Sequence, residues 1–290
     1  MSLLLAASAG SIAAATVVPA LAAVAVYGFA VEPYLLTRTD LDVRVPGLPP
    51  ELDGYTIAAL SDLHCGTATP PSFIARAFAI AQDARPDLVA LLGDYSVSTR
   101  RTRRLNRRWY AQGMRALSPM IRALRAPDGV VGVLGNHDHY YDAADVHAWL
   151  AGLGVRVLVN DSVVVRRGAA TLVIGGVDDA REGHVDPAGG CAGQPADAPT
   201  VVLAHNPDAV LALSAPRRVD LVLSGHTHGG QVVLPGIGAL ATHARICTRR
   251  AASGWVPNDR APLYVSRGVG GQHPPRVNCR PEVAIVRLRA

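Results

Sequence analysis

After residue 54, short runs of Val, Ile and Leu recur along the chain, and each run ends near a Gly, Asp, His or Asn. The runs are apolar at consecutive positions rather than at alternate ones, which is typical of strands that are buried on both faces. The pattern therefore predicts a series of buried strands, at 55–62, 87–94, 129–138, 171–176, 200–205 and 220–225.

Helical patterns separate the first three runs, because apolar residues there recur on one face of 71–84 and of 110–125. These faces carry Phe73, Ala77 and Ile80 in the first helix, and Leu117, Ile121 and Leu124 in the second. Residues 155–176 contain no such pattern and predict consecutive antiparallel strands. The alternation of strands and helices predicts an α/β fold, a β-sandwich of mixed sheets flanked by helices.

The first part of the chain is different, because no charged residue occurs between Leu3 and Val31. A helix needs about 20 apolar residues to cross a bilayer. A secretory signal has a shorter apolar region of about 7–15 residues and a basic start, which "MSLLL" lacks, although "PALAA" resembles a cleavage site and leaves a cleaved signal as an alternative. We expect an uncleaved N-terminal transmembrane helix within an anchor over 1–35, a linker over 36–54, and one catalytic domain over 55–290.

All 28 basic residues are arginine, and six of them lie in "TRRTRRLNRRWY" at 99–110. This stretch is either a contact for an anionic partner, such as a lipid head group, or a solvated helix face. A nucleic acid is the less favoured partner, because only Trp109 and Tyr110 are present there for base stacking. Arg38 and Arg44 follow the apolar segment and no arginine precedes it, so the positive-inside rule favours a single-pass protein of the inner (cytoplasmic) membrane with a cytoplasmic domain.

The cysteines do not define a metal or disulfide framework. Four are present, far apart and without a CxxC pair, at positions 65, 191, 247 and 279. Their number and spacing exclude a thiolate zinc motif and a disulfide scaffold, and they leave the redox compartment open.

Polar residues with metal-binding chemistry follow the expected strands. "SDLHCG" places Asp62 and His64 two residues apart, which puts them on one side of a strand end by alternation. Loops at the carboxyl ends of strands meet at one crevice in open α/β sheets. We therefore expect the polar residues after the other strands in the same place, namely Asp94, Asn136, His137, Asp138, His205, His226 and His228.

The set of carboxylates, an amide and imidazoles lacks the thiolates of a structural zinc site and the all-oxygen shell of a calcium or magnesium site. It suits two transition-metal ions that share one carboxylate, an arrangement used for phosphoryl displacement. A single histidine at a strand end is more often a core residue. Five such motifs in succession instead indicate a metal centre.

The order D-x-H, G-D, G-N-H-D, H, G-H-T-H resembles that of the calcineurin-like metallophosphoesterases over residues 55 to 288. "GHTHGGQVVLPGIG", "YVSRGVG" and "CRPEVAIVRL" are similar to a bacterial membrane-associated branch, one type of which cleaves UDP-2,3-diacylglucosamine. The resemblance implies the metallophosphoesterase fold and a metal-dependent hydrolase. It implies one metal held by Asp62, His64, Asp94 and His228, and a second held by Asp94, Asn136, His205 and His226, with Asp94 bridging.

The resemblance also implies that His137 donates a hydrogen bond or a proton at the leaving oxygen, and that Asp138 orients its imidazole. The glycines around His226 and His228 let the backbone approach closely. The remaining polar residues lie outside this pattern. His139, His147 and Cys65 are expected to be structural, and Arg267 and Arg276 are expected to be either structural or contacts for the substrate phosphate.

These expectations together describe a membrane-tethered phosphoesterase with two divalent transition-metal ions, Mn²⁺ first and Fe or Zn as alternatives. Its partner would be a phosphorylated small molecule or a lipid-linked substrate, cleaved at a phosphodiester or pyrophosphate bond. The N-terminal helix and the Arg100–Arg108 segment would contact the membrane. Two alternatives stay open, a phosphatase of broad specificity and a non-catalytic scaffold, although scaffolds of this kind typically lack ligands that are all present here.

Overall fold

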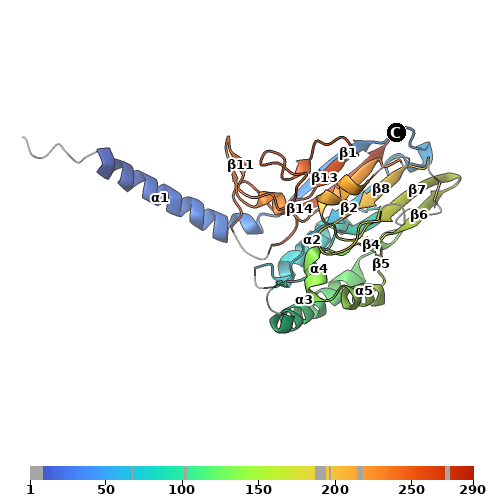
Figure 1. The fold of residues 1–290 in the computed structure, drawn as a ribbon, viewed down its shortest axis with the longest axis horizontal. Helices are drawn as coiled ribbons and strands as arrows, with labels where there is room; N and C mark the ends of the chain where they lie inside the picture. Colours follow the sequence, from blue (N-terminus) through green and yellow to red (C-terminus); the bar gives the residue numbers. More distant parts are fainter. Residues whose placement is uncertain are drawn as a thin grey trace, which may run out of the picture.

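Two six-stranded sheets face each other and enclose the main hydrophobic core, as the computed structural model shows (Figure 1). Ile57 and Leu88 of the first sheet pack in this core with Ile174 and Leu203 of the second. The structure describes residues 9–66, 68–100, 103–186, 194–195, 197–213, 218–271 and 275–290, with only the backbone at 9–16 and 103–106.

Both sheets are mixed. The first has the order β1 (Thr37–Arg44), β14 (Glu282–Arg289), β2 (Thr56–Leu60), β3 (Leu88–Leu91), β4 (Val130–Gly132) and β5 (Arg156–Val157). The second has the order β12 (Gly254–Trp255), β13 (Leu263–Val265), β9 (Leu221–Ser224), β8 (Thr200–Leu203), β7 (Ala170–Gly176) and β6 (Asp161–Arg167). Strands β2 to β5 are mutually parallel, as are β7, β8, β9 and β13, so their carboxyl ends deliver loops in a common direction within each sheet.

Helices cover the outer face of the first sheet. Phe73, Tyr110 and Leu150 from three of them pack on Leu60 and Leu91 of this sheet. The helices are α2 (Pro71–Asp83), α3 (Arg103–Ala123), α4 (Asn136–Tyr141) and α5 (Ala143–Gly152). The outer face of the second sheet is covered by the short helix η4 (Pro207–Ala212) and by residues of the loop 244–261. The predicted sandwich of mixed sheets flanked by helices is therefore confirmed.

The helix expected over 71–84 is α2, and its buried face carries Phe73 and Ala77. The helix expected over 110–125 begins earlier, at Arg103. Arginine is a good helix former, so the arginine-rich sequence extends the helix although it adds no apolar face. Arg107 and Arg108 are exposed. The structure does not describe positions 101 and 102 or the side chains of residues 103–106, so the expected membrane contact at Arg100–Arg108 stays a prediction. The cysteine at position 191 also lies outside the described residues.

The expectation for 155–176 is only partly correct. β6 and β7 form an antiparallel hairpin, but β5 belongs to the other sheet and pairs in parallel with β4. The physical reason is α5, which lies between β4 and β5. A helical crossover of this kind connects parallel neighbours, and the sequence pattern of α5 was not recognised.

The linker expected over 36–54 is wrong for residues 37–44, which form β1. This strand pairs with β14 along its whole length, from Thr37 with Glu282 to Arg44 with Arg289. Its alternating polar sequence, TRTDLDVR, is that of an edge strand with one face in solvent. The fold therefore begins before residue 55, while the remainder of the anchor, linker and domain division stays an expectation.

Helix α1 (Ala9–Ala30) projects away from the sandwich (Figure 1). Residues Val17–Tyr34 are long and apolar enough to cross a membrane, by length and composition, and 11% of this window is buried. A helix that is apolar on all sides needs an apolar environment to cover it. Within the described chain most of this surface is bare, which is consistent with a helix placed in lipid.

The end of α1 is fixed to the domain by backbone hydrogen bonds. The carbonyl of Gly28 accepts from the amide of Arg276 at 2.9 Å. Glu32 is buried, and its carboxylate accepts from the amide of Asn278 at 3.0 Å and from the amide of Cys279. The helix therefore leaves the domain at a fixed junction rather than through a free linker.

The junction predicts a stability effect. Glu32→Ala leaves two backbone amides in a buried place without their acceptor, which should destabilise the fold by about 1–3 kcal/mol. Chemical denaturation of the full chain in detergent measures this change. Glu51→Ala, at an exposed position, is the matched control, and equal denaturation midpoints for the two variants would show that the junction contributes nothing.

Candidate metal centre

The loop after β2 and the loop after β9 bring three potential ligands together. Nε2 of His64 and Nε2 of His228 are 3.2 Å apart, and Nε2 of His228 is 3.4 Å from Oδ1 of Asp62. One ligand atom of each residue lies within 4.8 Å of the others. Asp62 and His64 have no exposed side-chain surface. This group could hold one metal ion.

A second group forms beside the first. Nε2 of His205, after β8, lies 3.2 Å from Oδ2 of Asp94, 3.3 Å from Oδ1 of Asn136 and 3.3 Å from Nδ1 of His226. Ligand atoms of Asp94, His205 and His226 lie within 4.8 Å of one another. The structure therefore brings together all seven residues that the sequence predicted as ligands.

One carboxylate oxygen lies between the two groups. Oδ2 of Asp94 is 3.2 Å from Nε2 of His205 in the second group and 3.5 Å from Nε2 of His64 in the first. It is also 4.0 Å from Nε2 of His137. Asp94 therefore stands where a carboxylate shared by two ions would have to stand.

Most of these residues have left-handed backbone conformations. Strand β2 ends at Leu60, and Asp62 and His64 beyond it have φ values of 54° and 41°. Their convergence thus results from two left-handed turns, and the expected alternation along a strand is wrong. Asp and His enter this region more readily than most residues with a side chain. The other predicted ligands with positive φ are Asp94, His226 and His228.

Two glycines allow the loops to approach the ligands. A Cβ at Gly135 would collide with the carboxylate of Asp94, and a Cβ at Gly225 would collide with Oδ2 of Asp62. The expected role of glycine near His226 is confirmed at Gly225, which directly precedes it.

The protonation states suit cation binding. Burial lowers the pKa of His226 and of His228 to about 3, so both imidazoles are neutral, as metal ligands must be. Burial opposes the charge on Asp94, but the neighbouring histidines, His205 first, outweigh it and hold its pKa well below its ordinary value. Burial opposes the charge on His205, but Asp94 outweighs it and holds the pKa of His205 well above its ordinary value. The site therefore offers an ionised carboxylate and two neutral imidazoles, while His205 would lose a proton on binding a cation.

One buried atom at the first group also fits a cation. Oδ1 of Asp62 has no hydrogen-bond partner within the part of the chain that the structure describes. A buried carboxylate oxygen without a donor is costly unless a cation or another donor satisfies it. The donor set and this oxygen fit a divalent ion.

His137 lies at the mouth of the centre, with 18% of its side chain exposed. Its Nδ1 is 2.8 Å from the carbonyl oxygen of Ser98, and its ring meets that of His64 edge-on at 4.9 Å between centroids. The carbonyl of Ser98, and not the expected carboxylate of Asp138, is thus the acceptor that orients this imidazole.

Asp138 has a different position from the one expected. Its carboxylate accepts from the amides of Asp94 at 2.9 Å, Tyr95 at 3.1 Å and Gly135 at 2.7 Å, and from the hydroxyl of Tyr110. Both oxygens are therefore engaged by the loops after β3 and β4 and by helix α3. Burial raises the pKa of Asp138 to about 6.

Sequence reasoning missed three residues near the centre. Tyr110 lies seven residues before Leu117 on the buried face of α3, a spacing that could have identified it. Asp178 and Asp179 follow β7 in "GVDD", the same arrangement of a polar residue after a strand. Asp178 accepts from Nε2 of His139 at 2.9 Å. His139 therefore has a structural role, as expected, and holds this loop.

The two arginines that were considered for phosphate binding have structural partners. Arg276 is buried, and its guanidinium donates to the carbonyls of Gly270 at 2.6 Å, Arg267 at 2.9 Å and Cys279 at 3.1 Å. Nδ1 of His228 faces the same Gly270 carbonyl at 3.2 Å. Arg276 therefore supports the loop beside a predicted ligand and does not project into the centre.

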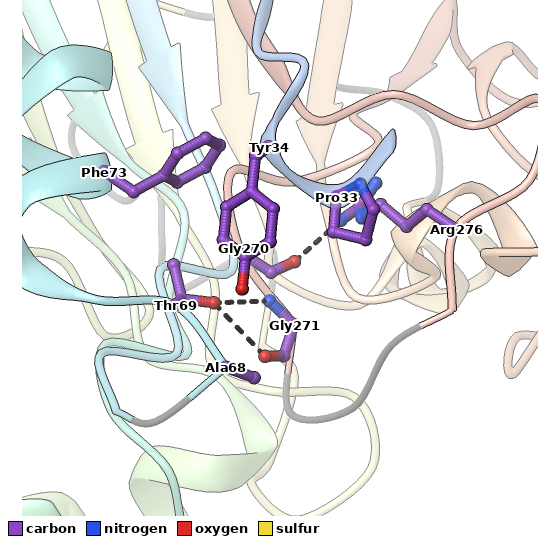
Figure 2. Close-up of a pocket in the computed structure, with 8 residues that line it drawn as sticks. All are labelled: Pro33, Tyr34, Ala68, Thr69, Phe73, Gly270, Gly271 and Arg276. Atoms are coloured by element: carbon purple, nitrogen blue, oxygen red, sulfur yellow. Dashed lines mark hydrogen bonds between the residues drawn. The ribbon is translucent and has the colours of Figure 1, made fainter. Parts of the chain in front are cut away.

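A small hollow of about 40 Å³ lies between this loop and the end of the apolar helix (Figure 2). Tyr34 and Phe73 form its apolar side, with ring centroids 5.9 Å apart and edge-on. Gly271 and Thr69, joined by a hydrogen bond of 3.1 Å, form its polar side. The hollow thus lies between the end of the apolar helix and the loop behind His228.

Two known proteins are similar to this chain over most of its length. Phosphodiesterase YaeI of Escherichia coli is 30% identical over 237 residues, which cover 81% of this chain and 82% of that protein. UDP-2,3-diacylglucosamine pyrophosphatase LpxG of Chlamydia muridarum is 26% identical over 314 residues, which cover 88% of this chain and 90% of that protein. A family model described as Calcineurin-like phosphoesterase matches residues 55–230, more than half of the chain. With its clusters of His and Asp, the chain therefore belongs to the calcineurin-like phosphoesterase family and is a metal-dependent hydrolase.

Proposed function

We propose that the protein hydrolyses a phosphodiester or pyrophosphate bond with two divalent transition-metal ions. Asp62, His64 and His228 would hold the first ion, with Asp94 as the ligand common to both. The ligands of the second ion would be Asp94, Asn136, His205 and His226. One observation carries this proposal. Oδ2 of Asp94 lies 3.5 Å from Nε2 of His64 in the first group and 3.2 Å from Nε2 of His205 in the second.

When bound, two such ions clamp the attacking and leaving oxygens of a phosphoryl displacement and lower the pKa of a water molecule. His137 would act at the leaving oxygen. Its Nδ1 must carry a proton to donate to the carbonyl of Ser98, so Nε2 is the nitrogen whose protonation can change. With Nε2 protonated, the imidazole would donate that proton to the departing oxygen.

The substrate would enter on the side of His137 and His228, because their side chains are 18% and 13% exposed while Asp62, His64 and Asp94 are at most 1% exposed. The apolar window Val17–Tyr34 supports a substrate with an apolar portion, because such a substrate would lie in the same lipid as this helix. We propose a lipid-linked substrate of the UDP-2,3-diacylglucosamine type, the compound in the name of one relative.

We propose a single-pass anchor at the N-terminus and a catalytic domain on the cytoplasmic side of the inner membrane. The support is the apolar window Val17–Tyr34 and the placement of Arg38 and Arg44 after it. Mn²⁺ is the ion that we propose first, since imidazole and carboxylate ligands together suit Mn, Fe and Zn.

The bridging role of Asp94 predicts that Asp94→Asn abolishes turnover and lowers the metal content of the purified protein, because both ions lose a charged ligand. Elemental analysis and a phosphodiesterase assay measure the two effects. Asp87→Asn, at the opposite end of β3, is the matched control and should keep its metal. Wild-type turnover in Asp94→Asn would contradict the two-ion assignment.

The role of His137 predicts a different result for His137→Asn. The rate should fall by roughly 10²–10⁴-fold, the usual contribution of an acid–base group, while the metal content stays close to that of the wild type. The exposed His147→Asn is the control and should change neither. Loss of metal from His137→Asn would make this residue a ligand instead.

A substrate panel with Mn²⁺ present tests the proposed substrate class. It compares a chromogenic phosphodiester, the corresponding monoester and UDP-2,3-diacylglucosamine in detergent micelles. We expect the highest kcat/KM for the acylated compound, because it alone would share a detergent micelle with the apolar helix of the protein. Equal values for all three would support the alternative of a phosphatase with broad specificity.

A further inference from the structure

A small hairpin projects from the domain beside the predicted centre. Strands β10 (Val233–Leu234) and β11 (Gly238–Ala239) pair in antiparallel register. Pro235 and Gly236 make the turn between them. Gly236 has a φ of 75°, and the amide of Ile237 donates to the carbonyl of Leu234 at 3.1 Å. Proline followed by a glycine with positive φ is the pattern of a type II turn, so the tip is well defined.

This hairpin exposes two large apolar side chains. Ile237 is 52% exposed and Leu240 is 51% exposed. Single exposed apolar residues are normal on protein surfaces. Ile237 lies at the turn, and Leu240 lies where the second strand returns to the domain, with its amide bonded to the carbonyl of Val232 at 3.0 Å. Two exposed aliphatic side chains on one small hairpin suggest a contact surface.

The hairpin lies next to the end of the apolar helix. The amide of Val233 donates to the carbonyl of Val277, and the amide of Val277 donates to the carbonyl of Gln231, both at 2.9 Å. The neighbouring residue Arg276 donates through its amide to the carbonyl of Gly28 in α1. One short segment thus binds the hairpin on one side and α1 on the other. Figure 1 shows β11 beside the end of α1 that meets the domain.

Basic residues accompany the apolar tip. The amide of Ala239 donates to the carbonyl of Arg249 at 2.7 Å, and the side chains of Arg249 and Arg250 are exposed. Apolar side chains beside arginines are the chemistry of segments that lie in the interface of an anionic bilayer. The aliphatic groups enter the acyl boundary, and the guanidinium groups remain among the phosphates.

We propose that the hairpin is a second membrane contact, in which Ile237 and Leu240 insert into the interface of an anionic phospholipid bilayer. The inference rests on the proposed anchoring of α1 in the membrane. The hairpin follows η5 (His228–Gly230) directly. Two contacts on one side of the domain, helix and hairpin, prevent rotation about the helix axis and hold the centre at a fixed height above the lipid.

The proposal is tested with the full chain reconstituted in vesicles of phosphatidylcholine and phosphatidylglycerol, with and without bromine on the acyl chains. Ile237→Trp places a fluorophore at the tip. Ala169→Trp, at an exposed position in the turn between β6 and β7, is the matched control on the other side of the sandwich (Figure 1). Leu21→Trp, in α1, reports on the anchor itself. Each spectrum is taken as the difference from the wild type.

We expect brominated lipid to remove most of the added emission of Ile237→Trp and of Leu21→Trp, and little of that of Ala169→Trp. The Ile237→Trp emission should also shift to shorter wavelength on reconstitution. Quenching of Leu21→Trp without quenching of Ile237→Trp would overturn the second contact while leaving the anchor in place. Lack of quenching in both would refute the anchor as well, and the phosphoesterase assays would still stand.

Discussion

The buried carboxylate of Asp138 is the group on which the geometry of the centre depends. It accepts hydrogen bonds from the amides of Asp94, Tyr95 and Gly135 and from the hydroxyl of Tyr110. These bonds join the loops after two adjacent strands to a helix on the outer face of the sheet. The amide of Asp94 is one of these donors. Asp138, which is not itself a predicted ligand, therefore helps to fix the position of the Asp94 carboxylate between the two groups of imidazoles. Hydrogen bonds to a charged group contribute about 1.5–3 kcal/mol each, which is enough to hold these loops in strained conformations.

The strain is located at the predicted ligands themselves. Asp62, His64, Asp94, His226 and His228 all have positive φ, a conformation that costs of order 1–3 kcal/mol where the surroundings impose it. In an extended strand, successive side chains point to opposite faces. A left-handed turn after the strand allows neighbouring ligands to point inward instead. The architecture thus uses the regular strands to fix the loops and the irregular backbone to aim the side chains.

The sequence was sufficient for six of the buried strands and for the set of residues that meet at the centre, because both follow local patterns. It did not identify β13 and β14, which are also buried. Runs of Val, Ile and Leu indicate buried strands, and a polar residue after each run indicates the edge where the strands end. β1 could not be found in this way, since TRTDLDVR has the polar alternation of an edge strand and its partner β14 is more than 200 residues away. The separation of β5 from β6 depends likewise on α5, whose weak apolar face gives no clear signal.

The role of Asp138 shows a second limit of sequence reasoning. Adjacency in "NHDH" suggests that the carboxylate serves the imidazole next to it. In a helical turn, however, neighbouring side chains point in different directions. Asp138 is three residues after Gly135, whose amide it caps, while His137 faces the carbonyl of Ser98 on another loop. Such choices between partners depend on tertiary structure, and no spacing rule contains them.

The segment 275–279 has a practical consequence for producing a soluble form of the enzyme. It binds Gly28 and Glu32 on one side, and on the other Arg276 holds the Gly270 carbonyl that faces His228. A truncation placed at residue 35, where hydropathy alone would place it, removes the acceptors of this segment together with the apolar helix. A chain that starts a few residues before Gly28 retains them, so the useful boundary for expression lies inside the apolar helix and not after it.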